Sequence, residues 1–348
     1  SDSSKQATLV NVKHLYRKGA LYPANYYPEL ANLAAYLPIN HIYVINMPTP
    51  HDWAMSSIHA VWKAFRFIKK NNFEIIHLTW PLRYGQFPLY LLRKRMVLTM
   101  HDPIPHSSNT DFINRFHRWV AFKLIKNFIV LSQSLKENFI NTYKLYNKNV
   151  SVSRLGTYDV LLNVKPQKIE TSSSYILYVG SINPHKGIKF LCEAMNFIKE
   201  QIPDLQLIIA GRGNFDFNIA EYQKNLNIKV INRFLTEEEL VYLIHMSKFV
   251  VCPYIDATQS GVVMSAFTLN KPVVATNVGA LSEMIENRRH GLLVPPQNSK
   301  EIAHAIIKMC QGDTLLEMSK NIQEDFREGK NSWEKIAEET INIYQNLK

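Results

Sequence analysis

The chain of 348 residues contains only three cysteines, Cys192, Cys252 and Cys310, and no two of them have a spacing typical of metal ligands. The sequence therefore predicts neither a disulfide framework nor a zinc site, and it is typical of a reducing compartment. No run approaches the roughly 18 consecutive apolar residues of a membrane-spanning helix. The first residues also lack the apolar stretch of a signal peptide, so we expect a cytoplasmic protein.

The positive charge is concentrated in one half of the chain. Residues 1–165 contain 21 Lys and Arg against 8 Asp and Glu, whereas residues 166–348 contain 19 against 21. This asymmetry indicates two domains with different partners. A basic first half suits nucleic acid, an anionic membrane or a phosphorylated substrate. Because no basic and aromatic motif of a known nucleic-acid module is present, we expect no nucleic-acid partner.

Short apolar runs alternate with amphipathic stretches along the whole chain, which predicts an α/β protein with parallel sheets. In the first half we predict strands at Ala7–His14, Asn40–Met47, Phe73–Thr79, Met96–Asp102, Phe128–Ser132 and Val150–Leu155. The helices predicted there are Pro28–Tyr36, Trp53–Lys70, Phe87–Lys94, Thr110–Lys126 and Gln133–Leu145. A polar stretch, Asn163–Ser174, interrupts the alternation and is interpreted as a linker between domains.

The alternation restarts after this linker. Strands are predicted at Tyr175–Gly180, Leu205–Ala210, Lys229–Asn232, Phe249–Pro253, Pro272–Thr276 and Gly291–Val294. Helices are predicted at Gly187–Gln201, Phe217–Asn225, Thr236–Met246, Gly261–Leu269 and Leu281–Glu286, and from Ser299 to the end with a break near Gly329. Thr236 and Glu239 have the spacing of a capping box. The result is two Rossmann-like halves of similar size.

Ligands of an open parallel sheet bind beyond the carboxyl ends of its strands, so the turns that follow the strands are the first candidates. Lys186 stands in such a turn before a helix and can reach a diphosphate, although a plain surface lysine is the alternative. Ser260 and Gly261 open a helix and can offer free N–H groups, although a simple N-cap fits equally. Gly211 and Arg212 form a third turn of this kind. His101, at the end of a strand, is a candidate for hydrogen bonding or proton transfer, with a structural turn as the alternative.

Five segments together resemble the nucleotide-sugar-binding domain of glycosyltransferase family 4, a family of retaining enzymes with the GT-B fold. They are Gly180-Ser-Ile-Asn-Pro-His-Lys-Gly, Ile209-Ala-Gly-Arg-Gly, Thr258-Gln-Ser-Gly-Val-Val, the run from Asn270 to Ile285, and His290-Gly-Leu-Leu-Val-Pro-Pro. The resemblance covers about residues 175–345, and in the first half it depends mainly on Leu98-Thr-Met-His-Asp-Pro. It implies a GT-B fold with an acceptor domain at 1–165, a donor domain at 166–330, and a final helix at 331–348 that crosses back to the first domain.

The resemblance implies a role for each matching residue. Lys186, Ser260, Gly261, Val262 and Arg212 would bind the donor diphosphate, with Lys186 and His101 catalytic. Gly211, Asn232, Arg233, Phe234 and Ser265 would bind the nucleotide, while Lys18, Gly19 and Asp102 would lie on the acceptor side. The sequence departs from the family at Ser181, where an Arg is usual, and at Ala257 and Ser265, where two Glu are usual. These departures place the recognition of ribose and sugar in doubt.

These roles predict an enzyme that moves a sugar from a nucleotide diphosphate to a glycan hydroxyl with retention at the reacting carbon. No Asp-x-Asp metal motif is present, so we expect neither a metal nor a cofactor. One alternative is a non-catalytic sugar-nucleotide-binding or scaffold subunit of the same fold. A nicotinamide-dependent oxidoreductase is another, but Gly211 and Gly213 lack the third glycine of its fingerprint.

Two stretches of the basic half, Trp53–Lys70 and Phe112–Lys126, interleave aromatic and basic residues. Such helices can lie in the headgroup layer of an anionic membrane, although they must also cover a sheet with part of their aromatic surface. Many enzymes of the resembled type extend lipid-linked glycans at the cytoplasmic face. We therefore predict a peripheral protein of the inner membrane face that takes a lipid-linked glycan as acceptor in cell-surface polysaccharide synthesis.

Overall fold

The computed structural model describes residues 20–28, 30, 38–46, 55–103, 112–172 and 174–347. The predicted strand Ala7–His14 lies outside these residues, as does the predicted helix Pro28–Tyr36 apart from residues 28 and 30. Two compact units emerge from the pattern of contacts. Unit 1 comprises Ser1–His101, Pro105–Ile129 and Phe139–Ser151, and unit 2 comprises Asp102–Ile104, Val130–Asn138 and Val152–Lys348. Each unit is described separately, and the predicted boundaries at residues 165 and 330 stay predictions.

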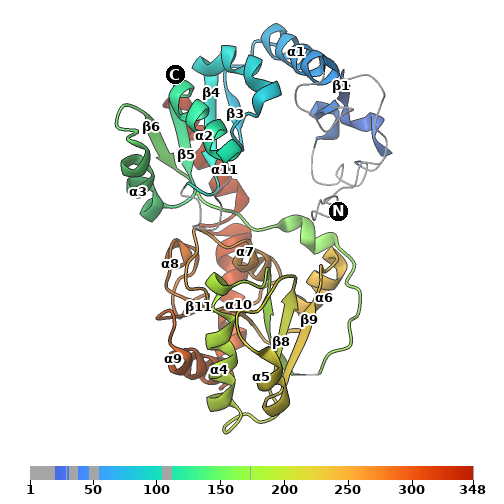
Figure 1. The fold of residues 1–348 in the computed structure, drawn as a ribbon, viewed down its shortest axis with the longest axis vertical. Coiled ribbons are helices and arrows are strands. Elements are labelled where there is room, and N and C mark those ends of the chain that lie inside the picture. The colour runs from blue at the N-terminus through green and yellow to red at the C-terminus, as the bar shows by residue number, and fades with distance from the viewer. Residues whose placement is uncertain are drawn as a thin grey trace. The chain divides into compact units, whose positions relative to one another are not determined.

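Unit 1 is built around a sheet with the strand order β3-β4-β5-β6 (Figure 1). Its strands are β3 (Ile76–Leu78), β4 (Met96–Met100), β5 (Asn127–Val130) and β6 (Asn149–Val152). Every residue of β4 and β5 is buried, as expected for strands covered on both faces. The helices of this part of the chain are α1 (Met55–Lys70), α2 (Phe112–Leu124) and α3 (Gln133–Tyr143), with a 3-10 segment η4 (Tyr84–Arg95).

The prediction of parallel sheets alone was wrong at the start of unit 1. Strand β1 (Ala20–Pro23) pairs antiparallel with β2 (Tyr43–Asn46), with Leu21 opposite Ile45. No strand was predicted at β1, because its four residues are too short a run to show periodicity. The predicted helix Phe87–Lys94 is part of the longer η4, which contains Pro88. Proline has no N–H group to donate, so Pro88 interrupts a continuous α-helical hydrogen-bond ladder at this position.

Unit 2 contains a six-stranded sheet with the order β12-β11-β10-β7-β8-β9. Its strands are β7 (Tyr175–Val179), β8 (Gln206–Gly211), β9 (Ile228–Asn232), β10 (Val250–Cys252), β11 (Val273–Thr276) and β12 (Gly291–Val294). All neighbouring strands run parallel, and β7, β10 and β11 are completely buried. The prediction of a second parallel sheet is confirmed.

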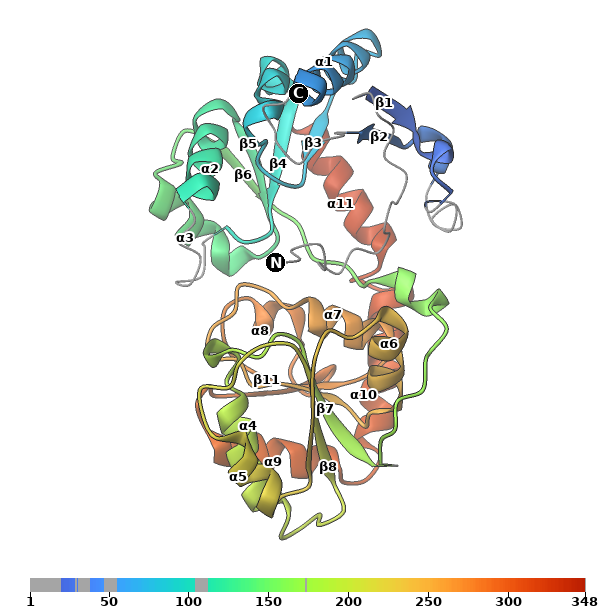
Figure 2. The same cartoon turned by 45° about the vertical axis from the view of Figure 1, so that its right-hand side comes forward.

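Helices cover both faces of this sheet (Figure 2). They are α4 (Ile188–Ile198), α5 (Ile219–Asn225), α6 (Glu237–Met246), α7 (Gly261–Thr268), α8 (Leu281–Met284), α9 (Ser299–Met309) and α10 (Thr314–Gln323). In Figure 2, α4, α5 and α9 lie on one side, and α6 and α10 lie on the other. The predicted capping box is confirmed, since the Thr236 hydroxyl accepts from the Glu239 N–H and the Glu239 carboxylate accepts from the Thr236 N–H.

The last segments are a π-helical turn η7 (Glu324–Glu328) and α11 (Trp333–Gln345), so the predicted break at Gly329 is confirmed. No helix of the described residues is long and apolar enough to cross a membrane.

The strand order of unit 2 creates a switch point at its two central strands. The chain moves outward from β7 through β8 to β9, and then returns to β10 on the opposite side of β7. At such a switch point the loops after the two central strands diverge and leave a crevice for a ligand.

Candidate donor site at the switch point of unit 2

A cavity of about 380 Å³ lies at the carboxyl ends of β7 and β10, where the switch point predicts a site. Its walls come from the turn after β7, from α6, from the end of β10 and from the first turns of α7. The lining residues are Val179, Gly180, Ser181, Lys186, Leu240, Tyr254, Gly261, Val262 and Ser265. The structure therefore brings together four residues that the sequence predicts for the donor site, namely Lys186, Gly261, Val262 and Ser265.

Lys186 is the cation of this cavity. Its Nζ atom lies 3.8 Å from the centre of the Tyr254 ring, and the Tyr254 side chain is itself fully buried. Burial lowers the pKa of Lys186, whereas the carboxylates of Asp102 and Asp256 act in the opposite direction. A cation that has lost part of its hydration in this way interacts strongly with an incoming anion. Sequence reasoning did not assign Tyr254, although its position directly after a buried strand is the signal that could have found it.

The turn that carries Lys186 is held against β10 by a close backbone contact. Lys186 ends a short 3-10 segment, η6 (Pro184–Lys186), and Gly187 follows it with a φ of 64°. A Cβ atom at Gly187 would lie 1.9 Å from the carbonyl oxygen of Pro253, so only glycine permits the approach. The Ile255 N–H also donates to the carbonyl of His185 at 2.9 Å. The lysine and the end of β10 are thereby fixed to each other.

The amino end of α7 supplies N–H groups to the same cavity. Ser260 is the N-cap, and its hydroxyl oxygen accepts from the N–H of Val263 at 3.3 Å. The N–H groups of Gly261 and Val262 donate to no group of the described residues, and both residues line the cavity. Free N–H groups and the positive end of the helix dipole favour an anion at this position.

No carboxylate lines this cavity, as the sequence departures imply. Ser265 uses its hydroxyl to donate to the Gly261 carbonyl at 2.9 Å, and Ala257 is buried away from solvent. Ser181 accepts from the side-chain amide of Asn183 at 3.0 Å. The charges at the cavity are therefore one ammonium group and the dipoles of two N–H groups, which suit a ligand with several negative oxygens.

The loops after β8 and β9 lie beside the cavity but do not line it. A Cβ atom at Gly211 would lie 1.7 Å from the carbonyl oxygen of Gly180, so these two loops touch through their backbones. The Asn232 side chain pairs with both backbone groups of Gly213, at 3.0 and 3.1 Å. Asn232 therefore joins the two loops.

Two further predicted nucleotide residues have protein partners in the structure. Arg233 forms two hydrogen bonds with the carboxylate of Glu239, at 2.6 and 2.7 Å, which lower the pKa of Glu239. Phe234 is half exposed, and the guanidinium group of Arg212 lies 4.9 Å from the centre of its ring. The ring and the guanidinium group form an exposed flat surface at this edge of the sheet. Their predicted role in nucleotide binding stays a prediction.

The remaining predicted residues fall elsewhere. His101 belongs to unit 1, where its ring stacks on Trp80 with 5.8 Å between the ring centres. Asp102 belongs to unit 2 and accepts a hydrogen bond of 2.8 Å from the Thr258 hydroxyl. Lys18 and Gly19 lie outside the described residues. The predicted roles of all four in catalysis or acceptor binding stay predictions.

Comparison with known proteins places this cavity in a recognised domain. The family model "Glycosyl transferases group 1" matches residues 173–312, and the model "Glycosyltransferase Family 4" matches residues 23–156. The chain carries both glycosyltransferase domains. All residues that line the candidate donor-site cavity lie within the group 1 match.

Relatives and solved structures agree with this result. An uncharacterized glycosyltransferase of Methanocaldococcus jannaschii is 25% identical over 343 residues, which span 91% of this chain and 86% of the relative. The O-antigen chain mannosyltransferase RfbU of Salmonella typhimurium is 25% identical over 72% of this chain and 69% of its own.

Among solved structures, sucrose-phosphate synthase of Thermosynechococcus elongatus matches with a TM-score of 0.62 at 20% identity, over 88% of this chain and 84% of its own. HepE of Anabaena in complex with UDP matches with a TM-score of 0.58 at 18% identity, over 82% of each chain. The fold is GT-B, as the sequence predicts.

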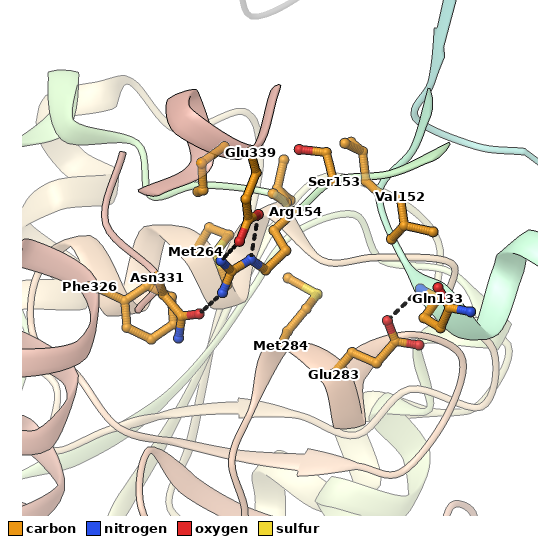
Figure 3. Close-up of a pocket in the computed structure, with 13 residues that line it drawn as sticks. Gln133, Val152, Ser153, Arg154, Met264, Glu283, Met284, Phe326, Asn331 and Glu339 are labelled. Carbon is orange, nitrogen blue, oxygen red and sulfur yellow. Dashed lines mark hydrogen bonds and ion pairs between the residues drawn. The ribbon is translucent and has the colours of Figure 1, made fainter. Parts of the chain in front are cut away.

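A second cavity of about 390 Å³ lies on another side of α7, where Met264 contributes to its wall (Figure 3). Its cation is Arg154, which is already paired with the carboxylate of Glu339 and donates to the side chain of Asn331 at 2.8 Å. Its other carboxylate, Glu283, accepts from the N–H of Gln133 at 2.7 Å. Because Arg154 is already paired and Glu283 adds a negative charge, this cavity is a poorer anion site than the candidate donor-site cavity.

A cluster of Glu286, His290 and Asp325 has the composition of a metal site, with ligand atoms that lie within 4.8 Å of one another. However, Asp325 is paired with Arg289 at 2.8 Å, and Glu286 is paired with Lys330 at 2.5 Å. The N–H of Glu286 donates to Nδ1 of His290, so the ring proton is on Nε2, which donates to Asp325 at 2.8 Å. These carboxylates are already neutralised by protein cations. The cluster is a partly buried ion network of unit 2 and does not fit a divalent cation.

This network predicts how the stability of the domain depends on pH. The guanidinium group of Arg289 lowers the pKa of Asp325 from 3.8 to about 2. A depressed pKa contributes stability that is complete above the unfolded value and is lost as the pH falls through the folded value. We therefore expect Asp325→Asn to lower the free energy of unfolding by about 2 kcal/mol at pH 7, and by roughly half as much at pH 3.

Urea unfolding of Asp325→Asn and the unsubstituted protein at pH 7, 5, 4 and 3 measures this difference directly. Glu301→Gln, which changes an exposed acidic residue of α9, is the control and should show no such trend. A difference that is constant from pH 7 to pH 3 would contradict the role given to Asp325.

Lys186 generates the second prediction. We expect Lys186→Ala to weaken binding of a nucleoside diphosphate by about 2 kcal/mol, because the variant removes the cation of the cavity. The free energy of unfolding should fall little, since a partly desolvated cation contributes little to stability. Isothermal titration with UDP and thermal unfolding measure the two effects. Lys189→Ala, on the exposed side of α4 three residues later, is the matched control.

Proposed function

We propose that this protein is a retaining glycosyltransferase that moves a sugar from a nucleoside diphosphate donor to a hydroxyl group of a glycan. The observation that carries the proposal is the cavity at the switch point of unit 2, where Lys186 and the N–H groups of Gly261 and Val262 face one space. Both glycosyltransferase domains are present in the chain. HepE, a structural neighbour, is described in complex with UDP and with UDP-glucose, which supports a donor of the same class here.

The mechanism follows from where charge develops. As the bond between the sugar C1 atom and the diphosphate oxygen lengthens, the sugar gains positive charge and the diphosphate gains negative charge. Lys186 and the two N–H groups stabilise the leaving diphosphate, each by roughly 2–4 kcal/mol in a dry site. The acceptor hydroxyl attacks C1 from the face that the diphosphate leaves, and its proton passes to a diphosphate oxygen. Because the acceptor attacks C1 directly, this route needs no protein nucleophile, which agrees with a cavity that no carboxylate lines.

Incubation of the protein with a panel of UDP-sugars and GDP-sugars and with glycan acceptors tests this function. We expect transfer from one donor, with the product retaining the anomeric configuration of that donor. Loss of transfer in Lys186→Ala, with transfer intact in Lys189→Ala, would support the assigned cavity. Inversion at C1 in the product would overturn the retaining mechanism.

His101 generates a separate prediction. His101 directly follows β4 in unit 1. We propose that it contacts the donor sugar near its reacting carbon and does not contact the nucleotide. We therefore expect His101→Ala to reduce kcat/KM for transfer by roughly tenfold, because the variant removes one hydrogen bond to the sugar, while the affinity for free UDP stays unchanged. An equal loss of UDP affinity would contradict this placement. His41→Ala, an exposed histidine of unit 1, is the control.

We further propose that the acceptor is a lipid-linked glycan in cell-surface polysaccharide synthesis, and that unit 1 docks peripherally on an anionic membrane at the cytoplasmic face. The name of the relative RfbU, an O-antigen chain mannosyltransferase, supports this class of acceptor. Exposed aromatic residues of α2 support the proposed membrane-binding surface. On α2, Val120, Ala121 and Phe122 are buried, whereas Phe112 and Trp119 are 77% and 57% exposed.

Basic groups accompany these exposed rings. The ammonium group of Lys123 lies 5.8 Å from the centre of the Trp119 ring, and Arg115 is exposed one turn earlier. An apolar face bordered by cations is the arrangement of a helix that lies in the headgroup layer. One face of α2 therefore covers the sheet, as expected, and the other is available to lipid.

Liposome sedimentation tests this membrane proposal. We expect binding to vesicles with anionic lipid at low salt, weaker binding as salt rises, and no binding to neutral vesicles. The double variant Trp119→Ala/Lys123→Ala should bind several-fold more weakly. Phe197→Ala/Lys199→Ala removes an exposed ring and an exposed lysine from α4 and the residue after it, so it is the matched control. Equal binding to anionic and neutral vesicles would contradict the proposal.

One observation favours a second candidate, a non-catalytic subunit that binds sugar nucleotides. Ser181, Ala257 and Ser265 stand where the resembled family has charged residues. A protein of this kind would bind UDP or GDP but would neither transfer the sugar nor hydrolyse the donor. Release of UDP or GDP from a sugar nucleotide in the presence of the protein alone distinguishes the enzyme from the subunit.

A further inference from the structure

Tyr158 lies beside the donor-site cavity without belonging to any predicted motif. It precedes a short 3-10 segment, η5 (Asp159–Asn163). A Cβ atom at Gly261 would lie 2.9 Å from the hydroxyl oxygen of Tyr158 and 3.4 Å from its ring atom Cε2. The hydroxyl group therefore occupies the space that a side chain at Gly261 would need, directly at the amino end of α7. Gly261 is not among the glycines with a positive φ, so a side chain at this position would be opposed by the Tyr158 hydroxyl and not by the backbone conformation.

The backbone around Tyr158 is fixed from two directions. Its N–H donates to the Thr268 hydroxyl at 2.8 Å, and that hydroxyl donates to the carbonyl of Met264. On the other side, Arg327 donates to the Asp159 carboxylate at 3.0 Å, and Trp333 donates through its indole N–H to the carbonyl of Thr157 at 2.9 Å. The residues next to Tyr158 are thus bound to the last turn of α7 and to the carboxyl-terminal segment. This leaves the phenol in a set position next to the first turn of α7.

The Tyr158 hydroxyl makes no hydrogen bond to any described residue, and the residue is 38% exposed. Burial raises the pKa of the phenol, so the group is protonated at neutral pH and can donate a hydrogen bond. The N–H group of Gly261, the residue that the phenol approaches, and the N–H group of Val262 also donate to no described residue. Unused donors of Tyr158 and of the first turn of α7 therefore lie at the same end of this helix.

We propose that the Tyr158 hydroxyl donates a hydrogen bond to the diphosphate of the bound nucleotide, next to the N–H groups of Gly261 and Val262. This inference depends on the proposed donor site. It adds a residue from the segment between the two sheets to a site otherwise built from β7, β10, α6 and α7. A side chain at position 261 would displace the phenol from the anion.

The test compares UDP, GDP and dTDP binding by isothermal titration in the full chain and in Tyr158→Phe. Phenylalanine keeps the ring and removes only the hydroxyl, so the melting temperature should stay unchanged. A hydrogen bond to a charged acceptor predicts about tenfold weaker binding of whichever nucleotide binds. Inorganic pyrophosphate should lose affinity by the same factor, because the contact is made to the diphosphate. Tyr146→Phe, which changes a tyrosine that is 72% exposed in unit 1, is the matched control.

Gly261→Ala supplies a second readout that simple loss of packing would not reproduce. Alanine favours helix, yet we expect weaker nucleotide binding, because its Cβ atom would displace the Tyr158 hydroxyl. In the Tyr158→Phe background the nearest atom becomes Cε2 at 3.4 Å, so adding Gly261→Ala should cost no further affinity.

The outcomes distinguish failure of the donor site from failure of the Tyr158 contact alone. If the full chain binds none of the three nucleotides, the proposed donor site and the role of Tyr158 both fail. If a nucleotide binds the full chain and Tyr158→Phe equally well while Lys186→Ala loses affinity, the donor site stands and the role of Tyr158 is overturned. Additive losses in the double variant would likewise show that the Tyr158 hydroxyl and position 261 act independently, against the inference.

Discussion

The candidate donor site depends on the backbone contact between the turn after β7 and the end of β10. Gly187 approaches the carbonyl of Pro253 so closely that no side chain fits between them. This contact brings Lys186 over the ring of Tyr254, whose hydroxyl lies 3.3 Å from that of Ser260, the N-cap of α7. Two loops that are far apart in the sequence thus become one anion site, because the reversal of strand order makes β7 and β10 neighbours.

The electrostatics of the site follow from what surrounds the lysine. Its ammonium group lies over an aromatic ring and has lost part of its hydration, which lowers its pKa, while Asp102 and Asp256 favour its charged form. No carboxylate lines the cavity itself, so no fixed negative charge opposes a diphosphate there. In contrast, the cations Arg154 and Arg289 are paired with carboxylates. Each of these pairs joins segments more than 30 residues apart and so contributes to the fold.

The segment from Arg154 to Asp159 connects this fold to the site. Arg154 binds Glu339 and Asn331, and Asp159 binds Arg327. The ring of Trp333 packs against Gly156, where a Cβ atom would lie only 2.6 Å from it. The carboxyl-terminal segment therefore binds the same stretch of chain that contains Tyr158, whose hydroxyl lies at the amino end of α7.

Much of this protein is determined by local sequence. Periodicity and length predict the buried strands of both sheets, and the Thr236–Glu239 capping box forms as its spacing requires, because these features involve residues close together in the chain. The turns that contain Lys186 and Gly261 are also evident from their position after buried strands. The antiparallel pairing of β1 with β2 is not evident from the sequence, because it joins segments about 20 residues apart that lack a hairpin turn signal.

Only the tertiary structure decided which of the predicted site residues line the cavity and which are bound to other protein groups. Lys186, Gly261, Val262 and Ser265 meet in one cavity, whereas Asn232 and Arg233 are bound to Gly213 and Glu239. A motif specifies which side chains follow a strand, but not which partners compete for them. Tyr158 is the clearest case, because its hydroxyl reaches Gly261 across more than 100 residues of sequence. A contact of that range depends on strand order and backbone packing, which no local pattern encodes.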